Sequence, residues 1–135
     1  MDDVAIPAAL LAFATLMIAV PAHLTQAMSR SGTLQRNRAF GIKTRATLRS
    51  DAAWSRGHAV AEPWLLAAAL CGYGTAAGAA LLLVLAASVG LSAVPALVIA
   101  IGGFVGATAQ VIAGGVVGNS AARDVEHRNP DPAAR

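Results

Sequence analysis

Three long stretches without a charged residue dominate the chain. They cover residues 4–22, 64–89 and 93–118. A helix needs about 20 residues to cross the hydrocarbon core of a bilayer, so each stretch is long enough to span it. A β-barrel is excluded, because the stretches show no alternation of polar and apolar residues and three strands cannot close a barrel. The sequence therefore predicts an all-α integral membrane protein with three transmembrane helices.

The charged residues lie almost entirely between and after these stretches. The expected loop 23–63 carries seven of the ten Lys and Arg residues but only two acidic residues, and the tail 119–135 carries the other three basic residues. Positively charged loops stay on the cytoplasmic side of a membrane. We therefore expect an ordered basic loop and a tail in the cytoplasm, with the N-terminus outside.

The predicted layout is a single membrane domain, residues 1–135. The preference for Arg over Lys and the abundance of Ala are typical of GC-rich bacteria, so we expect a bacterial inner membrane. A cleaved signal peptide in place of the first helix is disfavoured. Asp2 and Asp3 precede the first apolar stretch, where a signal peptide carries positive charge.

The sequence argues against several classes of function. It contains no residue pattern typical of a serine hydrolase, a zinc protease or a phosphate-binding loop, so we do not expect an enzyme. The apolar stretches lack Asp, Glu, Lys, Arg and His, the residues that line ion and proton routes, so we do not expect a channel or carrier acting alone. The basic loop holds no recognisable nucleic-acid-binding module, so no nucleic-acid partner is expected.

Four residues near the expected membrane surface are conceivable metal ligands: His23, Asp51, His58 and Glu62. Their spacing matches no standard zinc pattern, so a wet cluster at the membrane surface is the favoured interpretation. We expect neither a metal nor a cofactor. Cys71 is the one cysteine of the chain, and a single thiol inside an apolar stretch is most simply a packing residue.

The second half of the loop predicts a helix ahead of the second membrane span. Ser50 suits the N-cap position, and Asp51 suits the positive end of the helix dipole. A stripe of residues then recurs every three or four positions: Asp51, Trp54, His58 and Glu62. Because aromatic rings favour the membrane interface, we expect Trp54 and Phe40 to lie there.

The order of residues in this loop resembles the signature of a known family. The residues that carry the resemblance are Asn37, Phe40, Gly41, Lys43, Thr44, Thr47, Ser50, Trp54 and His58. Together they are similar to the loop of the SdpI-type family, small bacterial membrane proteins named for an immunity factor against a secreted sporulation-delay toxin. Lys43 stands where the family usually has Arg, and Lys cannot form the planar fork of a guanidinium group. The resemblance implies a cytoplasmic loop that is a recognition or structural element, and it implies no catalysis.

Small residues recur at helix-packing intervals in the second and third apolar stretches. The predicted packing face consists of Gly74, Gly78, Gly102, Gly106, Gln110, Gly114 and Gly118. Small residues four apart let helix backbones approach closely, and Gln110 is expected to face protein and hydrogen-bond across helices. Two interpretations stay open. The face packs the third helix against the other two, or part of it docks a second membrane protein.

These observations favour a protein that acts by binding. We expect a non-catalytic accessory or regulatory subunit of a larger bacterial inner-membrane assembly, for example a multi-subunit, lipid-importing ABC-type transporter. The expected partners are another integral membrane protein, such as a permease, and anionic lipid headgroups at the basic loop. The alternatives are an immunity-type protein that protects against a membrane-active peptide toxin, and a membrane sensor whose loop sequesters a cytoplasmic regulator.

Overall fold

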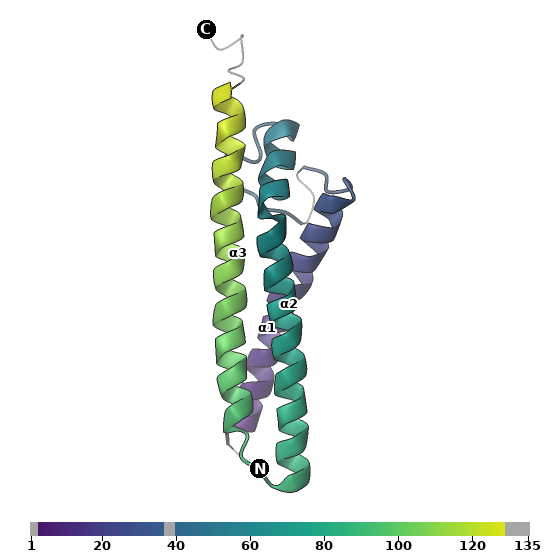
Figure 1. Ribbon diagram of the computed structural model, residues 1–135, viewed down its shortest axis with the longest axis vertical. Helices are drawn as coiled ribbons and strands as arrows, with labels where there is room; N and C mark the ends of the chain where they lie inside the picture. Colours follow the sequence, from purple (N-terminus) through teal and green to yellow (C-terminus); the bar gives the residue numbers. More distant parts are fainter. Residues whose placement is uncertain (1–2, 37–39, 129–135) are drawn as a thin grey trace.

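The structure, a computed structural model, describes residues 3–36 and 40–128. Three helices form an elongated bundle, α1 (Ala5–Arg30), α2 (Asp51–Val89) and α3 (Val94–Arg128) (Figure 1). α1 and α3 run in the same direction and α2 runs against them. Each helix is long and apolar enough to cross a membrane, and the described residues contain no strand. The predicted all-α membrane fold with three spanning helices is confirmed.

The helices continue beyond the apolar stretches. α1 reaches Arg30, α2 begins at Asp51, and α3 reaches Arg128. A helix pairs most of its backbone groups internally, so it continues out of the lipid until a capping residue or a glycine ends it. About half of the segment 23–63 between the first two apolar stretches is therefore helical. The described part of residues 31–50, which we call the connection, lies outside the helices.

Small residues fill the interior of the bundle, and large apolar residues face outward. One buried cluster joins the helices through Ala12, Ala79 and Ala100, and a second contains Ala22, Ala61, Leu65 and Ala68. Several large apolar side chains are 59–64% exposed, among them Leu10, Phe13, Leu70 and Val105. This distribution suits a bundle whose outer surface contacts lipid and whose backbones approach closely inside.

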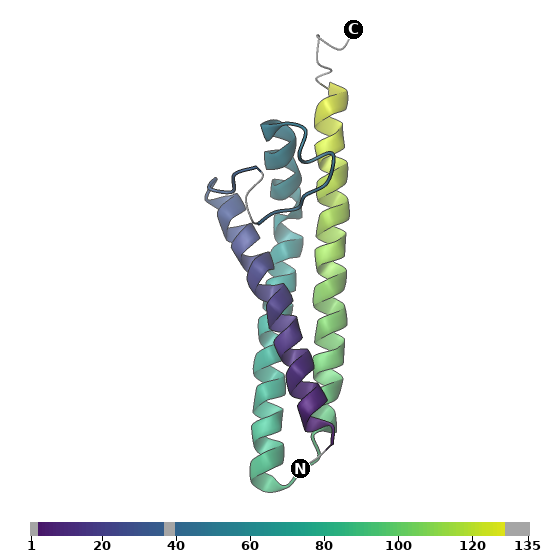
Figure 2. The same cartoon turned by 180° about the vertical axis from the view of Figure 1, so that it is seen from behind.

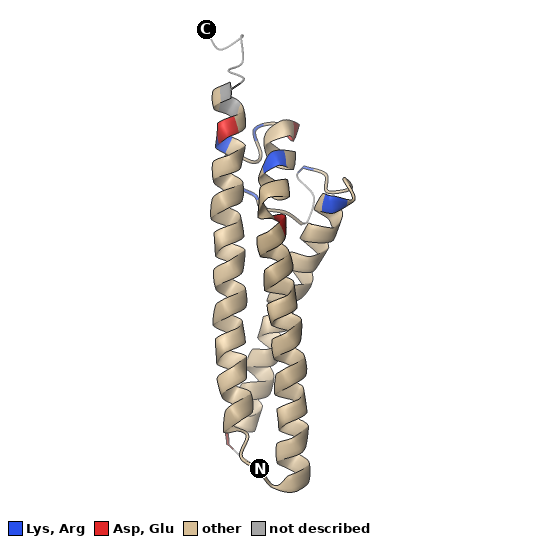
Figure 3. Ribbon diagram, viewed as in Figure 1, with Lys and Arg blue, Asp and Glu red and all other residues tan. Residues whose placement is uncertain are grey.

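Charged residues gather toward one end of the bundle (Figure 3). Apart from Asp3, the described Lys, Arg, Asp and Glu residues lie toward the end where the connection is found, which we call the charged end. The connection and the end of α3 therefore lie on one side of the membrane. The positive-inside rule assigns that side to the cytoplasm. This orientation, and the bacterial inner membrane, stay predictions.

Candidate functional site

The connection folds back against the first turns of α2. α1 and α3 diverge toward the charged end, and the connection passes between them (Figures 1 and 2). The described residues of the predicted signature lie either on the connection or on the first turns of α2. The signature therefore marks the place where one irregular segment packs on one helix end.

His58 ties the connection to α2. Its side chain is 1% exposed, its Nε2 accepts a hydrogen bond from the Ile42 amide (2.7 Å), and its Nδ1 lies 2.8 Å from the Trp54 carbonyl oxygen. Because an amide only donates and a carbonyl only accepts, Nδ1 carries the proton and Nε2 does not. Both ring nitrogens are thus occupied within the protein, which makes His58 a structural residue rather than a free ligand.

Trp54 is enclosed by the connection. It is 3% exposed, its Nε1 donates to the Leu34 carbonyl (2.9 Å), and its ring packs on His58 with centroids 4.2 Å apart. Trp54 is therefore covered by protein rather than exposed to headgroups, and its predicted depth at the membrane interface stays a prediction. The connection supplies the acceptor that an indole N–H otherwise finds among water and headgroups. Phe40, for which the same was expected, is half-buried and lines a groove described below.

Gly41 provides the space for these two rings. Its φ is 125°, and a Cβ added there would lie 2.6 Å from Trp54 Cη2 and 2.9 Å from His58 Nε2. Other residues rarely adopt this backbone conformation. This position therefore requires glycine for two independent reasons, the backbone conformation and the lack of space for a Cβ.

Thr47 holds the turn before α2. Its fully buried hydroxyl accepts from the Thr44 amide (2.9 Å) and donates to the Ile42 carbonyl (2.7 Å), while its own amide donates to the Thr44 hydroxyl (3.2 Å). These bonds satisfy backbone groups of a segment that has no regular secondary structure. Ser50 then caps α2 by accepting from the Ala53 amide (3.1 Å), so the predicted helix start is confirmed.

Replacing Thr47 with valine is expected to lower the free energy of unfolding by about 2 kcal/mol or more, because valine keeps the shape but leaves buried backbone groups unpaired. Denaturation of the purified protein in detergent, followed by tryptophan fluorescence, measures the change. Thr33→Val is the matched control, since Thr33 is exposed. It is expected to change stability by less than about 0.5 kcal/mol. Equal small effects of both substitutions would contradict the structural role of Thr47.

The predicted stripe that begins at Asp51 does not converge on one site. Asp51 is 87% exposed and pairs with Arg36 (2.9 Å), and an exposed pair contributes only about 0–1 kcal/mol. Glu62 accepts a hydrogen bond from Ser29 of α1 (2.7 Å). The Trp and His residues between them are buried, as described above. Within residues 3–36 and 40–128, no group of three His, Cys, Asp and Glu residues is placed to hold a metal ion.

The structure does not place every signature residue in this network. Lys43 is exposed, although it lies between residues that are fixed by the hydrogen bonds of His58 and Thr47. Asn37 lies outside the described residues. The network therefore gives a structural reason for most of the signature and leaves Lys43 on the surface.

The predicted glycine face divides between the inside and the outside of the bundle. Three members face α2: Gly106, Gly114 and Gly118. Nothing lies within 4 Å of a Cβ added at Gly74 or Gly102, and at Gly78 the nearest atom is 4.0 Å away. Packing inside the bundle thus accounts for the three glycines that face α2. Only Gly74, Gly78 and Gly102 are left as a possible docking face for a second membrane protein.

Close helix–helix contacts also involve three glycines outside the predicted face. A Cβ added at Gly57 would lie 2.9 Å from the Gly118 carbonyl oxygen, and one at Gly72 would lie 2.5 Å from a side chain of α1. At Gly103 an added Cβ would overlap the Thr75 side chain. Spacing within one helix does not identify these residues, because the partner of each lies on another helix.

Gln110 is half-buried on α3, and its side-chain oxygen is shielded from solvent. This oxygen has no hydrogen-bond partner among the described residues. The predicted bond across helices is therefore not made by the Gln110 oxygen. A buried oxygen without a donor costs about 1–3 kcal/mol, so this group does not stabilise the bundle.

A groove of about 370 Å³ lies beside the signature network. We call it the lateral groove. Its lining combines five residues of α1 with three of the connection and one each of α2 and α3: Met17, Ile18, Pro21, Ala22, Thr25, Phe40, Gly41, Ile42, Leu65 and Val111. Thr25 supplies the one polar side chain among these residues. The signature segment 40–42 thus forms one wall of an almost entirely apolar groove.

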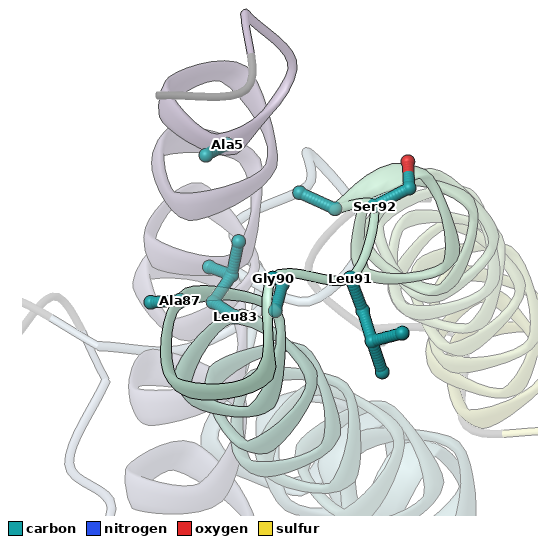
Figure 4. A pocket seen from close by; sticks show the side chains of 8 residues that line it. Ala5, Leu83, Ala87, Gly90, Leu91 and Ser92 are labelled. Carbon is teal, nitrogen blue, oxygen red and sulfur yellow. The ribbon is translucent and has the colours of Figure 1, made fainter.

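A second hollow, of about 650 Å³, lies at the opposite end of the bundle (Figure 4). It is bounded by Ala5 of α1, by Leu83 and Ala87 of α2, and by the turn at Gly90 and Leu91. Gly90 ends α2 with a φ of 72°, as a helix-ending glycine commonly does. No charged side chain is among the described lining residues, and the Ser92 hydroxyl is the polar side-chain group there.

Comparison with known proteins agrees with the signature. Residues 33–117 match the sequence profile of the SdpI/YfhL protein family, which is more than half of the chain. The match begins at the connection and ends within α3, so it includes the signature network and half of the residues that line the lateral groove. Searches among curated proteins and among solved structures found no match. The profile match, together with the three spanning helices and the buried signature network, places the chain in the SdpI/YfhL protein family.

Proposed function

We propose that the protein is non-catalytic and binds an apolar helical segment of a second molecule in the lateral groove. The observation that carries this proposal is the wall formed by residues 40–42 beside side chains of all three helices. His58 and Thr47 hold that wall through hydrogen bonds to Ile42. The signature residues thus fix the position of one wall of the groove. Their role in binding would be to keep that wall in place for the partner.

The groove suits apolar side chains within the bilayer. Its volume lies near the lower end of the range for ligand sites, about 300–1,000 Å³. Met17 at its edge is 53% exposed, so the groove is open on the side that faces lipid. A helix laid across such a groove inserts side chains spaced three or four residues apart. None of the described lining residues carries a charge that would have to be desolvated for this contact.

The nature of the partner separates two versions of this function. In the first, the partner is a transmembrane helix of a larger assembly, and the protein is its accessory or regulatory subunit. In the second, the partner is a membrane-active peptide, and the protein protects the cell from it. Membership of the SdpI/YfhL family favours the second version, because the family is named for an immunity factor. A place in a lipid-importing transporter and the capture of a cytoplasmic regulator stay predictions.

A photo-crosslinking amino acid in place of Met17 is expected to trap the partner in native membranes, since this side chain lies at the open edge of the groove. Val105, 61% exposed on α3 and outside the groove, is the control position. Mass spectrometry of the adduct distinguishes a membrane protein from a short peptide. Adducts of equal yield at both positions, or no adduct at Met17, would contradict binding in the groove.

Filling the groove is expected to block the partner. Ile18→Trp adds a large ring to the lining and should reduce the yield of the Met17 adduct at least about ten-fold, because overpacking a fitted contact costs about 1–3 kcal/mol. Val20→Trp is the matched control on the same helix, since Val20 is 39% exposed and is not a lining residue. A similar reduction by both variants would assign the effect to α1 in general rather than to the groove.

A further inference from the structure

A pocket of about 440 Å³ lies at the charged end, between the connection and α3. Its lining residues are Arg45, Ala46, Arg49, Asn119, Arg123 and His127. Three of these described residues are arginines and none is acidic. We propose that this pocket is a binding site for a phosphate group.

Buried alanines bring the two sides of the pocket together. Ala46 of the connection, Ala53 of α2 and Ala122 of α3 form one cluster in which each residue is at most 5% exposed. Ala46 follows Arg45 directly, and Ala122 precedes Arg123. Contact between the alanines therefore fixes the positions from which the arginines extend. The hydrogen bonds of the turn before α2, described above, hold this arrangement without a ligand.

The charges of the pocket suit the anionic oxygens of a phosphate group. Guanidinium groups gathered at one place repel one another, and a bound anion offsets that repulsion. Each guanidinium also presents a planar fork that matches two phosphate oxygens, and the Asn119 amide adds a further donor. Arg49 makes another interaction within the protein as well, so the site does not rest on Arg49 alone. Asp124 is exposed and is not among the lining residues.

The pocket lies at the depth of lipid headgroups. The apolar stretch of α3 ends at Gly118, and Arg123 follows after about 7 Å of helix. The headgroup region occupies about 5–8 Å on each side of the hydrocarbon core. A lipid phosphate therefore reaches the pocket within its own layer, and a free phosphate reaches it from water. Both ligands present a phosphate group to the pocket, and the depth of the pocket favours the lipid.

The test uses the full chain purified in detergent at physiological salt. Phosphatidylglycerol binding is measured by native mass spectrometry, and inorganic phosphate binding by calorimetry. The pocket variant combines Arg45→Gln with Arg123→Gln. The control variant combines Arg30→Gln with Arg56→Gln, which removes the same charge from exposed positions at the same end but outside the pocket. Circular dichroism should be unchanged in both variants, because the four side chains are exposed.

The pocket variant is expected to lose affinity about ten-fold or more, because two charge-assisted contacts are removed. The control variant should change less than about two-fold, since its two charges lie outside the pocket, do not contact the anion and are screened from it at this salt concentration. Phosphatidylglycerol binding lost in the pocket variant identifies a lipid headgroup, and phosphate binding lost in the same variant identifies free phosphate. Equal losses in both variants, unchanged affinity in the pocket variant, or no binding of either probe would overturn the proposal.

Discussion

Alanine in place of Gly41 is expected to lower the free energy of unfolding by about 3 kcal/mol or more. Two effects add. The positive φ of 125° strains any residue with a Cβ, at about 1–3 kcal/mol, and the methyl group would overlap the rings of Trp54 and His58, at about another 1–3 kcal/mol. The rings have little room to move, because both are hydrogen-bonded and buried.

Gly32→Ala separates the two effects. Gly32 also has a positive φ, 70°, but nothing lies within 4 Å of an added Cβ. Its replacement should therefore cost only the backbone strain, about 1–2 kcal/mol. Denaturation in detergent measures both variants, and a red shift of tryptophan emission in Gly41→Ala alone would report displacement of Trp54. Equal destabilisation of the two variants would mean that the rings do not constrain Gly41.

Leucine in place of Gly118 is expected to separate α2 from α3 at the charged end. A Cβ added there would lie 2.8 Å from the Gly57 carbonyl oxygen, and backbone cannot move aside as a flexible side chain does. The expected cost is about 3 kcal/mol, at the upper end of values for overpacking. Denaturation measures the loss of stability.

Gly102→Leu is the control on the same helix, because nothing surrounds a Cβ added at Gly102. The Gly102→Leu protein should keep the fold. Its free energy of unfolding should rise by at most about 1 kcal/mol, because leucine has a higher helix propensity than glycine. This variant also tests the outer part of the glycine face. If Gly102 docks a partner, the leucine variant folds normally and loses the partner. A Gly118→Leu protein as stable as the Gly102→Leu protein would contradict close packing of α2 on α3.

The fold followed from the sequence because a bilayer restricts the choices of the chain. An apolar stretch such as 64–89 has few alternatives to a spanning helix. The start of α2 was also predictable, since Ser50 and Asp51 form a local capping signal. The ends at Arg30 and Arg128 were not, because no sequence signal distinguishes a polar helix that leaves the membrane from a loop that begins there.

The candidate site was predictable as a set of residues but not as a geometry. The signature indicates that Trp54 and His58 belong together, whereas their hydrogen-bond partners are backbone groups of Leu34, Ile42 and Trp54 itself. Almost any residue type can supply a backbone hydrogen-bond partner, so the sequence does not show which residues do so. The preference of aromatic rings for the membrane interface therefore does not predict that the connection covers the Trp54 ring. The groove likewise depends on the divergence of α1 from α3, which no local pattern encodes.

The interior of alanine and glycine has a consequence for how such proteins diversify. The side chains that hold the helices together are small and tightly constrained, as at Ala12, Ala79 and Ala100. The bulky residues, such as Phe13 and Leu70, point outward and contribute little to that contact. Mutation can therefore reshape the outer surface to suit a new neighbour or a bilayer of different thickness while the scaffold stays intact.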